Sequence, residues 1–108
     1  TFDDGYQSHY KIVIDLLERY SVNAVFFIIS DFIGRPGYLT EQQLREMAER
    51  NFIIGSHTVN HIDCSKLGLD EFTFQLKESK RAIEDIIQKE VRYFSFPYGR
   101  EFVKFDEI

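Results

Sequence analysis

Apolar runs typical of buried strands recur along the chain, separated by segments with helical periodicity. Residues 24–29 are continuously apolar, as expected of a strand that is covered on both faces. Residues 51–54 and 93–96 have the composition of two further strands. Residues 1–5 read as the end of another strand followed by a tight turn, in which Gly5 permits a backbone conformation that residues with a Cβ resist.

Three helices are predicted between these strands. Apolar side chains at i, i+3, i+4 and i+7 predict an amphipathic helix over roughly residues 8–20. Thr40 and Gln43 form a capping-box signature at the start of a second helix, and Asp70 is expected to cap a third. The faces expected to be buried are apolar: Leu44, Met47 and Ala48 in the second helix, and Phe72, Leu76, Ile83 and Ile87 in the third.

The alternation of strands and helices predicts an α/β fold in which parallel strands are joined by right-handed helical crossovers. The chain has 108 residues, enough for one small domain and too few for two. Residues 100–108 carry no clear pattern. The pattern leaves open whether the sheet stays open or closes into a barrel.

Composition narrows the classes of partner. Hydrophobic residues make up 44% of the chain, enough for a buried core. The formal net charge of −5 argues against nucleic acid or an anionic membrane surface as a partner, and no apolar run reaches membrane-spanning length. Cys64 is the only cysteine, so no internal disulfide can form, and we expect it to be a small buried filler. Because the chain opens on Thr1 without an initiator methionine, we expect an excerpt from a longer protein.

Polar residues gather where three of the predicted strands end. Asp3 and Asp4 follow the first strand, His57 and His61 follow the strand at 51–54, and residues 97–99 follow the last. The carboxyl ends of parallel strands share one edge of a sheet, which is where α/β proteins usually bind ligands. Packing alone would be served by apolar residues, so this convergence favours a functional site.

The two histidines stand four positions apart, just after Gly55, which we expect to end its strand. This spacing places both imidazoles on the same face of a helical turn, close enough to bind one ion. Two neutral imidazoles and one carboxylate form a three-ligand site for a divalent metal with a position left for water. Because Asp3 and Asp4 cannot both point the same way in a regular strand, one would be a ligand and the other a base facing the water.

Plainer interpretations remain open for each stretch alone. Residues 3–5 could be a turn with a helix cap, and residues 97–99 form a common turn sequence. His9 lies at a helix start, away from the proposed edge, and is expected to be exposed and without a role.

Three motifs in this order and spacing resemble those of the polysaccharide deacetylases, the carbohydrate esterases of family 4 with a NodB-homology domain. They are T-F-D-D-G at residues 1–5, S-H-T-V-N-H at residues 56–61 and F-P-Y-G at residues 96–99. The resemblance implies a distorted (β/α) barrel, of which this chain would hold only part, with residues 1–108 as a single domain incomplete at both ends. It implies an enzyme that removes acetyl groups from N-acetylated sugars.

The resemblance also implies roles for individual residues. Asp3 would be the catalytic base, and Asp4, His57 and His61 would hold one divalent metal ion, zinc in most such enzymes and cobalt or another divalent ion in some. The backbone N–H of Tyr98 would stabilise the oxyanion.

The implied partner is an N-acetylated polysaccharide or oligosaccharide of the chitin, peptidoglycan or poly-N-acetylglucosamine kind, bound in part by Pro97 and Tyr98. A polymer of this kind favours the cell envelope or the exterior as the location.

Two departures from the family pattern keep an alternative open. Many members have Arg where Ser95 stands, and members usually protonate the leaving amine with a histidine in a later Leu-x-His motif, which this chain lacks. The alternative is a catalytically impaired relative that keeps the metal and binds glycan without turnover. A third interpretation is an α/β fragment with a fortuitous histidine pair.

Overall fold

A computed structural model describes residues 1–99 and 101–108, and its centre is one five-stranded sheet. The strands follow the order of the chain across the sheet: β1 (Phe2–Asp3), β2 (Val25–Ile28), β3 (Ile53–Ser56), β4 (Tyr93–Ser95) and β5 (Phe102–Lys104). β1 to β4 are parallel, as the alternating pattern predicts, so their carboxyl ends share one edge. β5 was not predicted, and it returns antiparallel beside β4.

Four helical segments carry the crossovers. They are a π-helical turn at His9–Val13 that continues into α1 (Ile14–Arg19), followed by α2 (Glu41–Glu49) and α3 (Leu69–Ile87). Single 3-10 turns at Ser30–Phe32, Cys64–Lys66 and Phe105–Glu107 lie in the connections. The helix expected over residues 8–20 therefore exists, but its first half is wound more loosely than an α-helix.

The capping box predicted for α2 is confirmed. The Thr40 hydroxyl accepts the N–H of Gln43, and the Gln43 side chain accepts the N–H of Thr40. The prediction that Asp70 caps α3 is wrong, because α3 begins at Leu69 with Gly68 as its N-cap. Asp70 lies in the first turn instead, where its carboxylate interacts favourably with the positive end of the helix dipole.

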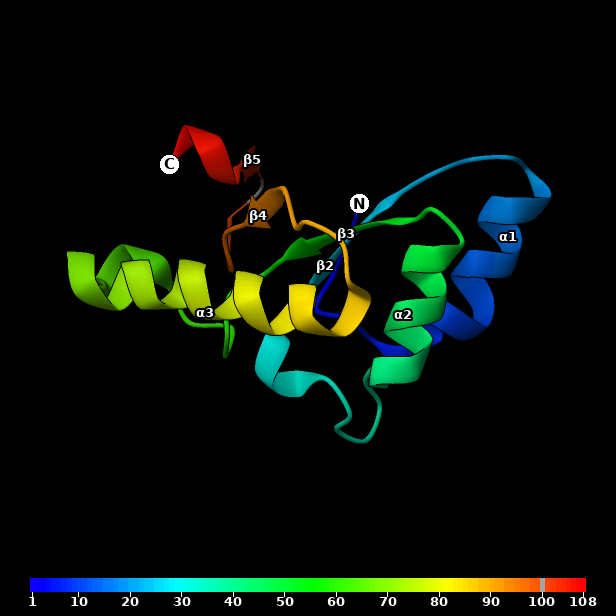
Figure 1. Cartoon of the computed structure of the whole chain (residues 1–108), viewed down its shortest axis with the longest axis horizontal. Helices are drawn as coiled ribbons and strands as arrows, with labels where there is room; N and C mark the ends of the chain where they lie inside the picture. Colours follow the sequence, from blue (N-terminus) through cyan, green and yellow to red (C-terminus); the bar gives the residue numbers. More distant parts are fainter. Residues whose placement is uncertain (100) are drawn as a thin grey trace.

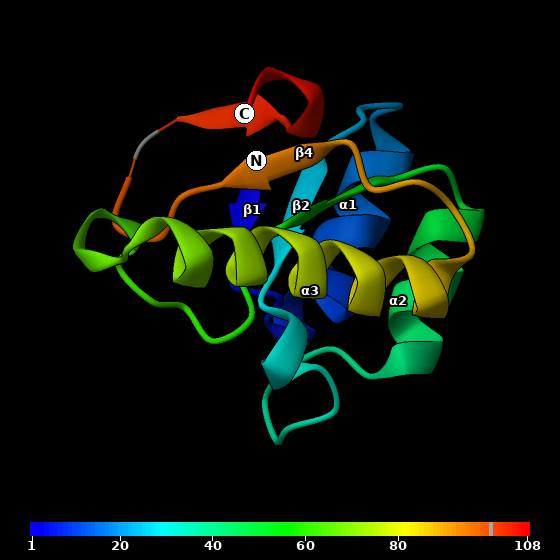
Figure 2. The ribbon, with the colours of Figure 1, turned by 60° about the vertical axis from the view of Figure 1, so that its left-hand side comes forward.

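The hydrophobic core lies between the sheet and these helices. Alternate strand residues such as Phe26, Ile28 and Ile54 point into it, and they meet Leu44 and Met47 of α2. Both ribbon views show α3 as the long helix crossing the sheet, with α1 and α2 next to each other near its carboxyl end (Figure 1, Figure 2). The other face of β2 presents Phe27, whose ring lies over Gly55 of β3.

The face that α3 buries differs from the prediction. Ile83 and Ile87 are buried as expected, but Gln75 and Ser79 take the positions nearest the sheet, while Phe72 and Leu76 are only half-buried. Polar residues are tolerated there because they are hydrogen-bonded: Ser79 Oγ donates to the Gln75 carbonyl oxygen 2.6 Å away.

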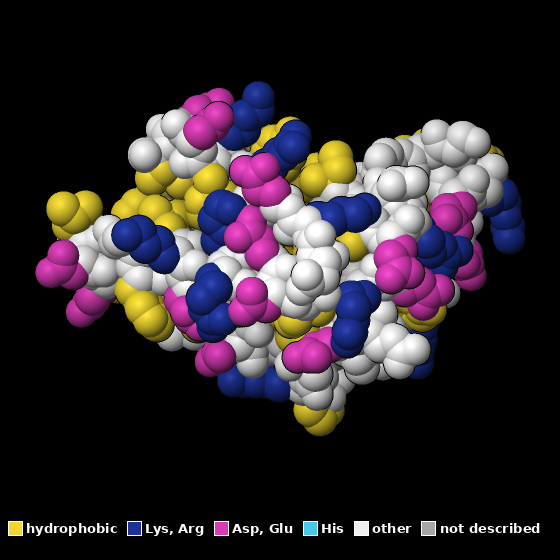
Figure 3. Space-filling model, viewed as in Figure 1, with side chains coloured by type: hydrophobic (Ala, Val, Ile, Leu, Met, Phe, Trp, Pro, Cys, Tyr) yellow, Lys and Arg dark blue, Asp and Glu magenta, His cyan; other side chains and the backbone are white. Residues whose placement is uncertain are grey.

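On the surface seen in Figure 3, acidic and basic side chains are interspersed over the helices, and hydrophobic side chains gather around the start of α3. Leu69 and Phe74 at that end are 79% and 56% exposed. Cys64 is half-buried rather than a core filler. Among the described residues, no helix combines the length and the apolar character needed to cross a membrane.

Candidate metal centre

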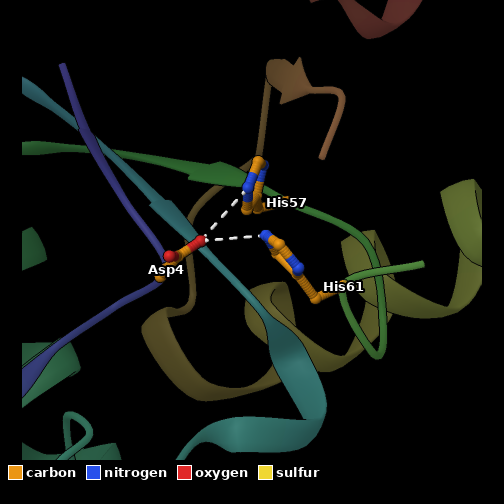
Figure 4. A group of neighbouring side chains, drawn as sticks. All are labelled: Asp4, His57 and His61. Carbon is orange, nitrogen blue, oxygen red and sulfur yellow. Dashed lines mark ion pairs between the residues drawn. The ribbon is translucent and has the colours of Figure 1, made fainter. Parts of the chain in front are cut away.

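Asp4, His57 and His61 bring one ligand atom each to a single point beyond the carboxyl ends of β1 and β3 (Figure 4). Asp4 Oδ1 lies 3.2 Å from His57 Nε2 and 3.3 Å from His61 Nε2. Ligands bound at about 2.0–2.1 Å in a tetrahedron lie about 3.4 Å from one another. The observed spacing therefore suits three ligands of one tetrahedral ion.

The histidine pair is not on a helical turn, which corrects the expectation from its spacing. His57 directly follows β3, and the segment to His61 is a loop in which Thr58 and His61 both have positive φ, 71° and 61°. Such angles are uncommon for residues with a side chain, and they cluster at functional sites, where the surrounding structure holds the backbone in them. Two side chains help to hold the loop: the N–H of His61 donates to Thr58 Oγ1, and the N–H of Val59 donates to Gln75 Oε1 of α3. The backbone N–H groups of Ser30 and Asp31 also donate to the carbonyl oxygens of Thr58 and Val59.

Gly55 also departs from the prediction, because it lies inside β3 rather than ending it. The strand runs on to Ser56, whose hydroxyl donates to Ser79 Oγ at 2.6 Å. The apparent strand break has a packing reason: the Phe27 ring of β2 occupies the space that a side chain at Gly55 would fill.

The backbone of β4 fixes the proton position on His57. His57 Nδ1 lies 2.9 Å from the carbonyl oxygen of Ser95, and a carbonyl can only accept, so Nδ1 carries the hydrogen. Nε2 then presents its lone pair toward Asp4, the form in which imidazole binds metals. Burial lowers the pKa of His57, which is 2% exposed, so the neutral ring is favoured at neutral pH.

Asp4 has one oxygen with a partner and one without. Oδ2 accepts a hydrogen bond from the Tyr6 hydroxyl at 3.1 Å, which raises the pKa of Tyr6. Oδ1 is buried and has no hydrogen-bond partner among the described residues. An ion pair with His57 would need a protonated ring, which the burial of that ring disfavours. A carboxylate oxygen that faces an imidazole lone pair is repelled by it unless a cation lies between them, so the residues fit a divalent metal.

The other residues expected at the site lie around this centre. Asp3 is exposed at the end of β1, close enough for its charge to oppose the effect of burial on the pKa of His57. The Tyr98 ring lies 5.0 Å from the His61 ring, centroid to centroid, and is 76% exposed. Tyr98 also has a positive φ of 66°, while Pro97 before it is buried.

His9 is not exposed as expected. It is half-buried among the rings of Phe2, Tyr6 and Phe26, with centroid distances of 5.3, 5.7 and 5.9 Å. Its Nδ1 atom is buried without a hydrogen-bond partner among the described residues, and burial lowers its pKa.

Residues 1–107 match the family model described as polysaccharide deacetylase. The chain belongs to the polysaccharide deacetylase family. A peptidoglycan-N-acetylglucosamine deacetylase of Bacillus cereus is 36% identical over 100 residues, which cover 92% of this chain and 45% of that protein. A chitin deacetylase of Pestalotiopsis sp is 34% identical over 98 residues, which cover 91% of this chain and 33% of that protein. The structure of the Streptococcus pyogenes deacetylase PplD in complex with acetate matches with a TM-score of 0.87 at 27% identity, over 93% of this chain and 45% of that one.

The resemblance drawn from the three motifs is thus confirmed, and so is the fold class. The chain spans less than half the length of the polysaccharide deacetylases just described. Its sheet and helices correspond to part of their distorted (β/α) barrel.

Two contributors to the geometry of the Asp4, His57 and His61 cluster carried no signal that sequence reasoning used. Ser95 acts through its main-chain carbonyl, which any residue type supplies. Tyr6 stands two residues after Asp4, in the turn that contains Asp4, and its hydroxyl donates to the Asp4 carboxylate. From the sequence alone, an aromatic residue at this position would be interpreted as a packing residue.

Proposed function

We propose that this chain forms the metal-binding part of a single hydrolase domain that removes acetyl groups from the N-acetylated sugars of a polysaccharide. The observation that carries the proposal is the buried Asp4 Oδ1, which has no hydrogen-bond partner among the described residues and faces the Nε2 atoms of His57 and His61. Membership in the polysaccharide deacetylase family supports the same chemistry.

Asp4, His57 and His61 would hold one divalent ion. Two imidazoles and one carboxylate are a donor set that zinc accepts, and cobalt binds the same donors. When bound, such an ion lowers the pKa of a water and polarises the acetyl carbonyl. The Ser95 carbonyl keeps His57 in the tautomer that this binding needs.

The remaining steps fall to residues beside the ion. Asp3 is free of the ligand cluster and exposed, so its carboxylate accepts the proton of the attacking water. The N–H of Tyr98 donates to the oxyanion that forms at the acetyl carbon, and loss of one such donor typically lowers kcat on the order of 10²–10³-fold.

The substrate class follows from the relatives and from the surface beside the site. The relatives' names specify N-acetylglucosamine in peptidoglycan and chitin as substrates. The exposed ring of Tyr98, which follows buried Pro97 and packs against His61, offers a flat apolar face to a sugar. A polymeric glycan of this kind favours the cell envelope or the exterior as the location.

A second candidate is a relative that binds metal and glycan without turnover. The chain holds three histidines: two form the ligand pair, and His9 is packed among aromatic rings. Within this chain no imidazole is therefore placed to protonate the leaving amine, and Ser95 cannot form the ion pair that an arginine would make with Asp3.

The test is acetate release from a panel of N-acetylated glycans by the intact protein, with and without a chelator and after zinc is restored. The deacetylase releases acetate, stops with chelator and recovers with zinc. Asp3→Asn should keep stoichiometric zinc but lose about 10²–10⁴-fold in rate, because only the base is removed. Asp4→Asn should lose both zinc and activity.

Asp31→Asn is the matched control, since Asp31 is an exposed carboxylate in the 3-10 turn at Ser30–Phe32, outside the ligand cluster. Acetate release that is indifferent to chelator would contradict the proposal. Bound zinc and bound glycan without acetate release would establish the second candidate instead.

A further inference from the structure

The two oxygens of the Asp4 carboxylate are divided between different partners. Oδ1 faces His57 Nε2 and His61 Nε2 at 3.2 and 3.3 Å, and Oδ2 accepts the Tyr6 hydroxyl at 3.1 Å. The terminal torsion of an Asp side chain is broad and nearly two-fold, so nothing in Asp4 itself selects this orientation. The backbone of Asp4 has a φ of 78°, which is uncommon for a residue with a side chain.

The Tyr6 ring is held in place although it is 43% exposed. It stacks on the Tyr38 ring with centroids 5.4 Å apart and planes 27° apart, and the His9 ring meets it edge-on at 5.7 Å. Aromatic pairs of this geometry are typically worth about 0.5–1.5 kcal/mol beyond their buried area.

The backbone around Tyr6 is fixed as well. Tyr6 and Tyr38 form an isolated antiparallel bridge. On either side of it, the N–H of Gln7 donates to the Gly37 carbonyl and the N–H of Leu39 donates to the Gly5 carbonyl, both at 2.9 Å. The loop that contains Tyr38 therefore fixes the turn that contains Asp4, and the hydroxyl of Tyr6 stays directed at Oδ2.

We propose that Tyr6 is a positioning residue for the metal centre: its hydroxyl holds Asp4 Oδ2 so that Oδ1 alone is presented between the two imidazoles. The proposal rests on the metal site of the proposed function and adds a residue to it. Tyr6 does not contact the ion, so its effect passes through Asp4. Hydrogen bonds from outer residues to metal ligands typically change metal affinity or activity by about 10–100-fold.

The test compares Tyr6→Phe with Tyr38→Phe in the intact protein. Both variants keep the stacked pair of rings, and only Tyr6→Phe removes the bond to Asp4. Zinc affinity is measured by competition with a chromophoric chelator. The visible absorption of the cobalt(II)-loaded protein then reports ligand geometry without reference to turnover, and urea midpoints in chelator compare folding.

Tyr6→Phe is expected to bind zinc at least about tenfold more weakly than the unsubstituted protein. Its cobalt spectrum should change, because Asp4 becomes free to turn and bind through either or both oxygens. Tyr38→Phe should match the unsubstituted protein in affinity and spectrum, and all three urea midpoints should agree.

Equal zinc affinity and equal cobalt spectra for Tyr6→Phe and the unsubstituted protein would overturn the proposal. So would equal losses in both variants, because the loss would then follow the packing of the ring pair. If Tyr6→Phe also lowers the urea midpoint, its zinc affinity and cobalt spectrum must still differ from those of Tyr38→Phe in the absence of urea, where both variants are folded, for the proposal to stand. Failure of the unsubstituted protein to bind any zinc would contradict the proposed function itself, so the two failures are distinguishable.

Discussion

Gly55 has no room for a side chain, and its replacement by alanine should destabilise the protein measurably. A Cβ at this position would lie 2.6 Å from Phe27 Cε1, 2.7 Å from Phe27 Cδ1 and 3.1 Å from the carbonyl oxygen of Tyr93. Carbon atoms pack best at about 3.5–4.0 Å, so the Phe27 ring would have to move by about 1 Å. Phe27 is 1% exposed and its ring also contacts that of Phe102, so it cannot turn into solvent.

The magnitude follows from two opposing effects. Overfilling a packed interior typically lowers the free energy of unfolding by about 1–3 kcal/mol. Against this, replacing glycine by alanine raises the free energy of unfolding by about 0.5–1 kcal/mol, because glycine in a strand interior loses more backbone entropy on folding than alanine does. The expected net loss for Gly55→Ala is about 1–2 kcal/mol, a substantial part of the roughly 5–15 kcal/mol that stabilises a typical domain.

Urea unfolding followed by circular dichroism measures this difference. Gly68→Ala is the matched control, because no atom of the described residues beyond its chain neighbours lies within 4 Å of a Cβ at Gly68, and its φ of −72° suits alanine. At Gly68, alanine is a weaker helix cap than glycine, which lowers stability, but it also reduces the entropy of the unfolded chain, which raises stability. These two effects roughly cancel. A free energy of unfolding for Gly55→Ala within about 0.5 kcal/mol of the Gly68→Ala value would refute the close contact between Gly55 and Phe27.

Three further predictions concern stability. Thr40→Ala removes the capping box of α2 and should lower the free energy of unfolding by about 1 kcal/mol, whereas Thr40→Ser should not; equal urea midpoints for both variants would contradict this. Burial lowers the pKa of His57 and of His9, so the unfolded chain binds protons more readily than the folded one. In chelator, the stabilisation from keeping these two histidines neutral should be fully present above the unfolded-state pKa of about 6.5. It should be lost as the pH falls through their lower pKa values in the folded protein, and a urea midpoint that stays constant between pH 8 and 5.5 would disprove this. Free zinc at about 100 times its dissociation constant should add about 2.7 kcal/mol to the unfolding free energy, and Asp4→Ala should abolish the gain; a thermal shift that survives in Asp4→Ala would place the zinc elsewhere.

Local signals in the sequence predicted most of the regular structure. The continuous apolar run that became β2 and the Thr40–Gln43 pair that caps α2 act through neighbouring residues alone, so single-sequence reasoning finds them. β5 was beyond such reasoning because it has three residues and exists only by pairing with β4. The buried Gln75 was missed for a similar reason, since its burial depends on the histidine loop that it supports.

The sequence predicted which side chains meet at the candidate site, but not how the backbone brings them together. Asp4, His57 and His61 could be named because few other residue types bind a divalent ion. The helical turn proposed for the histidines was wrong. Thr58 has a positive φ, and threonine so rarely adopts such an angle that the sequence gives no sign of it. The main-chain carbonyl of Ser95 could not have been found from side-chain identities.

Anomalous diffraction from zinc-loaded crystals of the intact protein would locate the metal ion without reference to activity. We predict one peak beyond the carboxyl ends of β1 and β3, bound by Asp4 Oδ1, His57 Nε2 and His61 Nε2 at about 2.0–2.2 Å. Asp3 should stand beside the peak without binding it. A peak at another cluster, or no peak at a saturating zinc concentration, would contradict the metal centre and the hydrolase proposed from it.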